Sequence, residues 1–95
     1  PMRDNSIGLA SLNGHIEVVR LLLNDSRVDP SYRGSESLRW ASQKGYTEIV
    51  KLLLADPRID PAAANNSALI MAIKNHHIDI VKLLLADPRI DPASR

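Results

Sequence analysis

The sequence predicts an all-α solenoid of three helix-loop-helix units, and three observations support this fold class. One ten-residue segment is written three times, as LLLNDSRVDP at residues 21–30 and as LLLADPRIDP at residues 52–61 and 83–92. The copies are spaced 31 residues apart, and a fixed period of this size is typical of stacked supersecondary units. With one Trp, two Tyr and no Phe, the core must be built from aliphatic side chains, as packing of helix on helix allows.

Charge and composition exclude several classes of partner. Twelve basic and eleven acidic residues give a formal charge of +1, without the clustered positive charge that nucleic-acid binding requires. The apolar runs are far shorter than the roughly 20 residues that cross a bilayer, and no signal-peptide pattern is present. We therefore expect no nucleic-acid and no membrane partner. The lack of cysteine excludes disulfides and fits an intracellular, cytoplasmic protein.

Each unit is expected to open with a short helix, over residues 5–13, 37–44 and 67–75. In the first unit Asn5 or Ser6 is placed to cap the helix by accepting a backbone N–H bond. Gly14 and Gly45 are placed to end the first two helices, because a helix C-terminus commonly needs positive φ. His76 replaces this glycine in the third unit, which implies either a histidine at positive φ or a shifted helix end.

A second helix follows in each unit, over residues 15–23, 47–54 and 78–86. Its apolar residues form a wide stripe, which in the first unit must be covered on more than one side. An acid in the first turn and a base three residues later recur on the outer face, as Glu17 with Arg20, Glu48 with Lys51 and Asp79 with Lys82.

The loops that follow the second helices are expected to be turns built on aspartate. Each helix must end near an Asp-Pro pair, because proline disfavours helical geometry in the residue before it. The aspartates are placed to accept bonds from nearby backbone N–H groups. After Pro30 and Pro61 we expect an exposed connection of about half a dozen residues that leads to the next helix.

These features together resemble the ankyrin repeat. On the family pattern T-P-L-H-x-A-x-x-x-G-H, the chain reads NSIGLASLNGH from Asn5, ESLRWASQKGY from Glu36 and SALIMAIKNHH from Ser67. Ala10, Ala41 and Ala72 fall on the small position between paired helices. The resemblance implies an ankyrin-repeat solenoid, a single array over residues 1–95 with units of approximately 5–35, 36–66 and 67–95. The period is two residues shorter than the family's usual length of about 33, so the hairpin-like loops should be short.

The two ends of this array lack the polar substitutions that terminal units normally carry. Leu83, Leu84 and Leu85 have no following unit to cover them. We therefore expect the chain to be a segment of a longer array, or its uncapped terminal repeats to pack end to end.

No pattern in the sequence predicts a catalytic residue, a metal site or a cofactor, so an enzyme is not expected. His76 and His77 are adjacent, with Asp79 nearby, but adjacent residues rarely converge on one ion. Asp56 with Asp60, and Asp87 with Asp91, could resemble paired carboxylates, yet identical copies on successive loops indicate turn architecture. The serines at helix starts, Ser6, Ser37 and Ser67, have no consistently placed base.

The resemblance implies reversible recognition of a partner protein through the concave inner-helix and loop surface. The contact candidates are Arg33, Glu36, Arg39, Gln43, Lys44, Asn65, Ile70 and Lys74. Trp40 lies where the family has an apolar residue, and we expect it in the core. The alternative function is a structural spacer within a longer ankyrin array, with no partner of its own. The near-identity of the repeated loop segment favours the spacer, whereas the variation among Gly8, Arg39 and Ile70 favours the binder.

Overall fold

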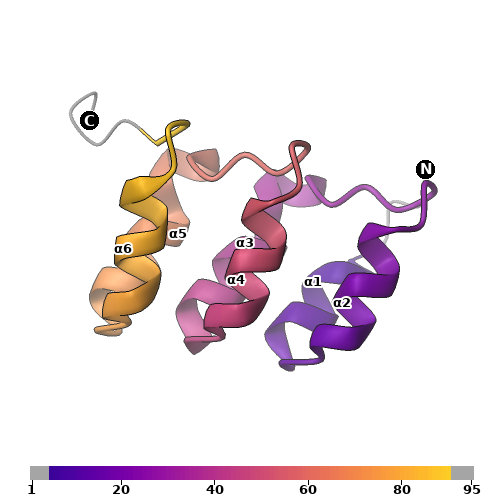
Figure 1. Ribbon diagram of the computed structural model, residues 1–95, viewed down its shortest axis with the longest axis horizontal. Helices are drawn as coiled ribbons and strands as arrows, with labels where there is room; N and C mark the ends of the chain where they lie inside the picture. The colour runs from indigo at the N-terminus through magenta and orange to yellow at the C-terminus, as the bar shows by residue number, and fades with distance from the viewer. Residues whose placement is uncertain (1–4, 91–95) are drawn as a thin grey trace.

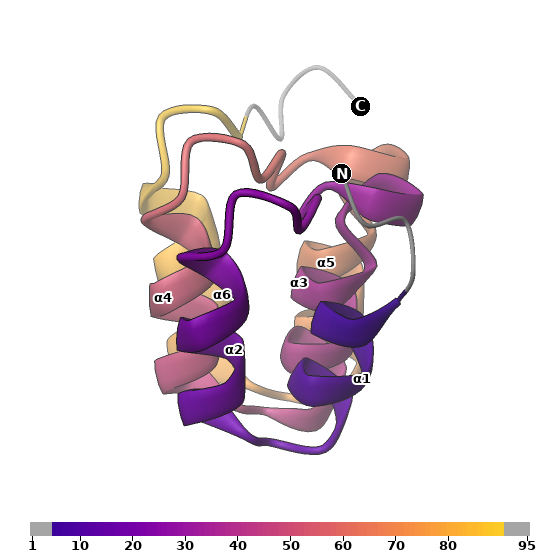
Figure 2. The same cartoon turned by 90° about the vertical axis from the view of Figure 1, so that its right-hand side faces the viewer.

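A computed structural model describes residues 5–90, except for the side chains of residues 33 and 34, and it confirms the all-α fold (Figure 1). Its helices are α1 (Ser6–Leu12), α2 (Ile16–Leu23), α3 (Tyr32–Lys44), α4 (Thr47–Leu54), α5 (Ala63–Lys74) and α6 (Ile78–Ala86). Successive helices form antiparallel pairs, and the three pairs stack side by side (Figure 1). Figure 2 shows two layers, with α1, α3 and α5 in the first layer and α2, α4 and α6 in the second.

The second-layer helices lie within a residue of their predicted bounds, but the stripe of the first one is not fully covered. Val19 is buried, whereas Val18 is 44% exposed and Leu21 is 71% exposed. Their counterparts one unit later, Ile49 and Leu52, are buried and half-buried. Val18 and Leu21 are exposed because they face away from α4, on a side of α2 that no described residues cover.

The bounds of two first-layer helices, α3 and α5, include a turn that comes before the predicted helix starts at Ser37 and Ser67. Ala64, Asn65 and Asn66 form a left-handed turn with φ between 55° and 61°, and Ser35 has φ of 60°. The prediction of an exposed connection is therefore wrong for part of this segment, since Ser35 and Asn66 are buried. The connections cross the end of the core from the second layer to the first (Figure 2), which is consistent with the burial of these two side chains.

Positive φ ends the first-layer helices as the glycines predict. Gly14 has φ of 74° and Gly45 has φ of 81°. His76 also has φ of 57°, so the first of the two alternatives for the third unit is confirmed. Asn5 occupies the N-cap of α1 but makes no side-chain capping bond, so that prediction is wrong for Asn5.

The core is a single aliphatic cluster between the two layers. Ala10, Ala41 and Ala72 are buried, as a small residue between paired helices should be, and Leu53 is completely buried. Trp40 is only half-buried and lies outside the main apolar cluster, which corrects its assignment to the core. It occupies the same position in its unit as Leu9, which is 49% exposed.

Candidate protein-binding surface

The repeated Asp-x-Arg segment folds each loop into the same turn. The Oδ1 atoms of Asp25, Asp56 and Asp87 each accept a bond of 2.9 Å from the backbone N–H two residues later. The guanidinium of that second residue donates to both carboxylate oxygens, at 2.7–3.0 Å. The carboxylate thus fixes both the turn and the direction of the arginine side chain, in agreement with the predicted role of the aspartates.

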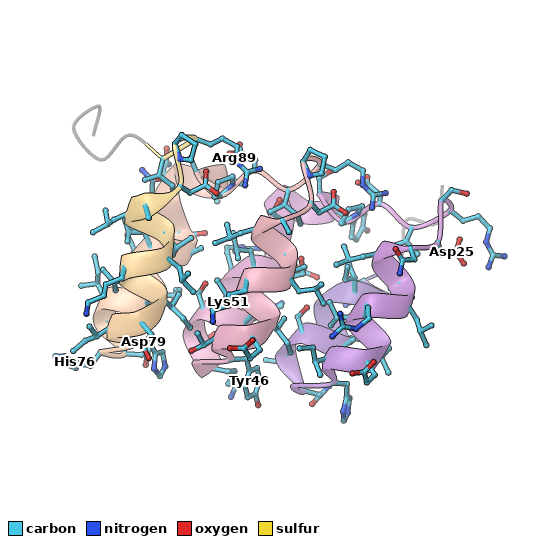
Figure 3. The ribbon with its side chains drawn as sticks, in the orientation of Figure 1. Asp25, Tyr46, Lys51, His76, Asp79 and Arg89 are labelled. Atoms are coloured by element: carbon cyan, nitrogen blue, oxygen red, sulfur yellow. The ribbon has the colours of Figure 1, made fainter. Side chains whose placement is uncertain are left out.

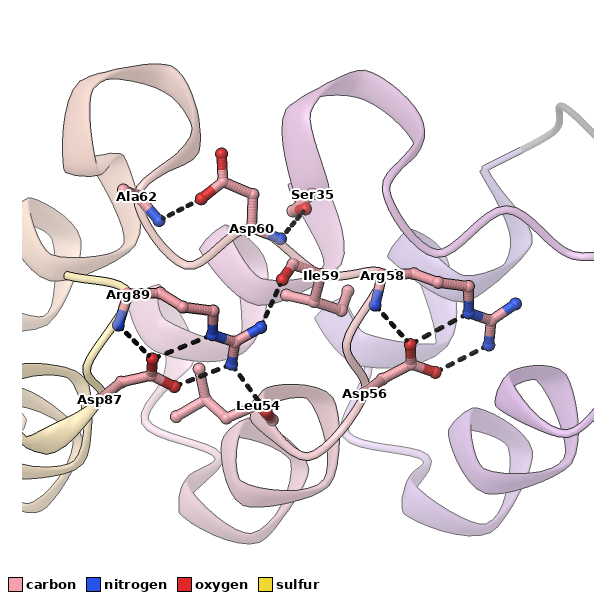
Figure 4. A network of polar contacts seen from close by, with 9 residues as sticks. All are labelled: Ser35, Leu54, Asp56, Arg58, Ile59, Asp60, Ala62, Asp87 and Arg89. Atoms are coloured by element: carbon pink, nitrogen blue, oxygen red, sulfur yellow. Dashed lines mark hydrogen bonds and ion pairs between the residues drawn. The ribbon is translucent and has the colours of Figure 1, made fainter.

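Two of these arginines, Arg58 and Arg89, also bind the preceding unit, and Figure 4 shows these contacts for Arg89. Arg89 Nη2 donates to the carbonyl oxygen of Leu54 at 2.8 Å, and its Nη1 donates to that of Ile59 at 2.8 Å. Arg58 repeats the arrangement, with Nη2 at 2.9 Å from the carbonyl oxygen of Leu23. Leu23 and Leu54 are the last residues of α2 and α4, so each arginine places positive charge at a helix C-terminus. We call this arrangement the arginine clip.

The ion pair within each loop shifts the pKa of its members. Hydrogen bonds from Arg27 lower the pKa of Asp25 to about 2. Hydrogen bonds from Arg58 and Arg89 likewise hold the pKa of Asp56 and Asp87 below its ordinary value. These carboxylates are therefore ionised at neutral pH and are not poised to donate or accept protons, as an acid/base pair would be.

At the opposite end of the helices, an aromatic ring from the second unit and one from the third unit each lie on the helix-ending glycine of the unit before it. A Cβ atom added at Gly45 would lie 2.7 Å from Cε1 of His77, and one added at Gly14 would lie 3.0 Å from Cζ of Tyr46. His77 Nε2 also lies 3.0 Å from the carbonyl oxygen of Gln43. Tyr46 and His76 mark this edge of the stack in Figure 3. Glycine is thus favoured at these positions by space as well as by φ.

Four of the predicted contact residues lie together on the first layer. Arg39 and Gln43 are four residues apart on α3, and Ile70 and Lys74 are four residues apart on α5, so each pair shares one helix face. Because α3 and α5 pack side by side, the two faces adjoin. Arg39 and Gln43 are half-buried, and Ile70 and Lys74 are exposed. We call these four residues the inner-helix patch.

The remaining predicted contact residues differ in position or exposure. Glu36 is buried at 6% exposure and lies against α1, where a Cβ atom on Gly8 would be 2.7 Å from its Oε1. Its Oε2 is 4.0 Å from Nη2 of Arg39, the limit of an ion pair, and its burial leaves little of it accessible to a partner. Lys44 is exposed one residue beyond the patch, and Asn65 is exposed on the left-handed turn at the other end of α5. The Arg33 side chain lies outside the described residues.

The second layer carries grooves that the sequence did not indicate. One of about 460 Å³ lies between α4 and α6 and is lined by Thr47, Glu48, Lys51, Asp79, Lys82, Leu83 and Ala86. A similar groove lies between α2 and α4. Each groove is lined by residues of two successive units, which repeat every 31 positions. In the sequence, only the recurring acid-base pairs that line the grooves point to them. Glu48 and Lys51 form such a pair at 3.1 Å.

No group of three or more His, Cys, Asp or Glu side chains that could hold a metal ion occurs among the residues with described side chains. His76 is exposed beside the half-buried His77, and Asp79 lies on the following helix (Figure 3). Within the described part of the chain, no helix is long and apolar enough to cross a membrane.

The comparisons with known proteins agree with the repeat architecture. A family profile described as ankyrin repeats in three copies matches residues 7–95. No curated protein and no solved structure matches the chain significantly. Repeats of this family are generally protein–protein interaction modules and are typically non-catalytic. The family match covers nearly the whole chain and agrees with three stacked helix pairs, so the chain belongs to the ankyrin-repeat family.

Proposed function

We propose that this chain recognises a partner protein through the inner-helix patch of Arg39, Gln43, Ile70 and Lys74. The observation that carries the proposal is that the side chains at these positions differ from unit to unit, whereas the helices and loops that hold them repeat. The first unit has Gly8 at the position equivalent to Arg39 and Ile70. It has Leu12 at the position equivalent to Gln43 and Lys74. The loop segment, by contrast, is identical in two of its three copies. Accessible side chains that differ from unit to unit can supply the specificity of a binding surface.

The frame that carries the patch supports this function. The arginine clips and the ring-on-glycine contacts join each unit to the next at both ends of the helices. A surface that is rigid before binding loses less conformational entropy when a partner docks. Contact is also more extensive among α1, α3 and α5 than among α2, α4 and α6. Tighter packing in the first layer favours curvature toward it, which supports a concave surface at the patch.

The test is affinity capture from a lysate of the native source with a charge-matched control. The patch variant combines Arg39→Gln with Lys74→Glu; glutamine replaces Arg39 so that no second acid is placed beside the buried Glu36. The control variant combines Arg20→Gln with Lys51→Glu on the second layer, which makes the same change in charge. Circular dichroism checks that both variants keep the wild-type helix content. A protein retained by the wild type and the control but lost by the patch variant supports the proposal.

The second candidate function is a spacer with no partner of its own. The identical LLLADPRIDP segments favour it, because their arginines and aspartates serve contacts between units. Capture of no specific protein by the wild type would favour the spacer. Equal capture by all three proteins would show that a partner binds outside the inner-helix patch and does not depend on Arg20 or Lys51. Loss of capture by the control variant alone would indicate that the partner binds the second-layer grooves, which these two residues line.

A further inference from the structure

Charge is distributed unevenly between the two helix layers. The first-layer helices α1, α3 and α5 contain four basic residues and one acid, which gives a formal charge of +3. The second-layer helices contain three basic and three acidic residues, whose charges cancel. The three repeated loop segments contain two aspartates and one arginine each, so they are negative. The chain as a whole is nearly neutral, but its first layer is basic.

The one acid of the first-layer helices does little to neutralise their surface. Glu36 is only 6% exposed, and its Oε2 lies 4.0 Å from Nη2 of Arg39. Arg39 is half-buried, and Lys44 and Lys74 are exposed. Among the described side chains of α1, α3 and α5, no acidic side chain is exposed. A molecule that docks on this layer therefore meets accessible positive charge.

The position of Arg39 in its unit faces the first-layer surface and not a neighbouring unit. Arg39 belongs to the middle unit, where α3 packs against α1 on one side and against α5 on the other. Its side chain is nevertheless 32% exposed. Ile70 occupies the same position one unit later and is 43% exposed. Arg39 and Ile70 therefore lie next to each other on one face.

The inner-helix patch places this apolar side chain beside two cations. Ile70 is level with Arg39 on the adjacent helix, and Lys74 lies one helical turn beyond Ile70. Adjacent helices pack about 8–10 Å apart and four residues of a helix rise about 6 Å, so the backbones at Arg39 and Lys74 are about 10–12 Å apart. About two turns of an α-helix cover this distance. One short segment of a partner can therefore contact both cations and Ile70 at once.

We propose that the partner presents an acidic segment to the patch, with carboxylates paired to Arg39 and Lys74 and an apolar side chain packed on Ile70. The proposal rests on the proposed function, because it takes the inner-helix patch as the binding surface. Opposite charge favours encounter and suppresses wrong partners, and the apolar contact adds specificity. A nucleic acid fits less well. Three accessible cations are few for a phosphate backbone, and Ile70 offers no aromatic ring on which a base could stack.

The test is an NMR titration of the ¹⁵N-labelled chain with three peptides of equal length. In the acidic peptide, leucines are separated by pairs of glutamates; in the other two, glutamine or lysine replaces every glutamate. The acidic peptide should shift the amide resonances of α3 and α5 and leave those of α4 and α6 unchanged. Its dissociation constant should increase with salt concentration, because salt screens exposed charges. The glutamine and lysine peptides should bind at least tenfold more weakly.

Two charge-matched variants show which cations the acidic peptide uses. Arg39→Gln with Lys74→Gln should weaken its binding roughly tenfold, because two partly exposed ion pairs are lost. Arg20→Gln with Lys51→Gln removes the same charge from the second layer and should leave binding unchanged. Circular dichroism checks that both variants are folded.

Several results would overturn the proposal. They are an acidic peptide that does not bind at millimolar concentration, a glutamine peptide that binds as tightly, and equal losses of binding in the two variants. Tighter binding of single-stranded oligothymidine than of the acidic peptide would also overturn it, in favour of a nucleic acid.

Capture from the lysate distinguishes failure of this proposal from failure of the proposed function. Suppose that a captured protein is lost by Ile70→Gln but retained by Arg39→Gln with Lys74→Gln, in low and high salt alike. The patch would then bind a partner without using opposite charge, so the proposed function would stand and the acidic partner would be refuted. Peptide binding as expected, without capture of any protein that depends on the patch, would support the charge preference and count against the proposed function.

Discussion

The arginine clip predicts a graded response when its three arginines are replaced by alanine one at a time. Arg89 donates to two carbonyl groups of the preceding unit, each at 2.8 Å. Arg58 makes one bond at 2.9 Å and a second at 3.4 Å, near the limit of a hydrogen bond. Arg27 makes neither of these bonds to a residue that the structure describes, although all three form the same ion pair with an aspartate of their own loop. The clip's contribution can thus be separated from that of the ion pair.

The magnitude follows from the bonds that are lost. A hydrogen bond from a charged donor stabilises a protein by about 1.5–3 kcal/mol when it is buried, and partial exposure reduces this value. The Arg89 side chain is 35% exposed, so its two bonds should contribute about 1–3 kcal/mol to the free energy of unfolding. For a chain of this size, that loss should lower the urea midpoint by about 1–2 M. Arg58→Ala should have a smaller effect, and Arg27→Ala should leave the midpoint nearly unchanged.

The assay is equilibrium unfolding in urea, followed by far-ultraviolet circular dichroism. It should be run at a concentration where the chain is monomeric, so that association does not add to stability. An equal loss for Arg27→Ala and Arg89→Ala would refute the reasoning, because the ion pair within the loop would then account for the whole effect. If the substitution changed the slope of the unfolding free energy against urea concentration, the cause would be partial unfolding of one unit and not a weaker clip.

Three other perturbations should change the stability of the chain in defined directions. Leu53→Ala should lower the free energy of unfolding by about 2–5 kcal/mol, because it leaves a cavity at a completely buried position. His76→Gly should raise it by about 0.5–1 kcal/mol, since it relieves a histidine held at positive φ. The lowered pKa of Asp87 stabilises the fold above the unfolded-state pKa of about 3.9, and this contribution should disappear as the pH falls through the lower folded-state value. Asp87→Asn should therefore make the urea midpoint less sensitive to pH below about 4.

Each of these outcomes has a measurement that could contradict it. Urea midpoints that do not move with Leu53→Ala would show that the assigned core is wrong. A lower melting temperature for His76→Gly would mean that the imidazole makes contacts worth more than the backbone strain. Parallel acid titrations of wild type and Asp87→Asn, followed by circular dichroism, would show that other carboxylates control acid unfolding.

The repeat largely determined how much of the fold was predictable. The second-layer helices and the two glycine stops follow from local rules, since periodicity, proline and positive φ act within a few residues. The left-handed turn at residues 64–66 does not, because it contains no glycine and its sequence resembles the start of a helix. Asparagine tolerates this conformation, and the two asparagines there were the available signal.

The candidate site was less predictable because its contacts join residues about one repeat apart. Glu36 is charged and was expected at the surface, but the missing side chain at Gly8 of the neighbouring unit leaves it a buried place. The receptors of Arg58 and Arg89 are backbone carbonyl groups, which carry no mark in the sequence. Only the recurrence of arginine at one position of all three loop segments indicated a shared role.

The short sequence separation of the clip contacts also has a consequence for folding. Each one joins residues only 30 or 35 positions apart, and packing between helices connects the same or adjacent units. The chain therefore has few contacts between distant parts of its sequence, which favours rapid folding. Any adjacent pair of units can act as a nucleus, and structure can spread from it in either direction. Pulling on the two ends should release units one after another instead of disrupting the whole core at once.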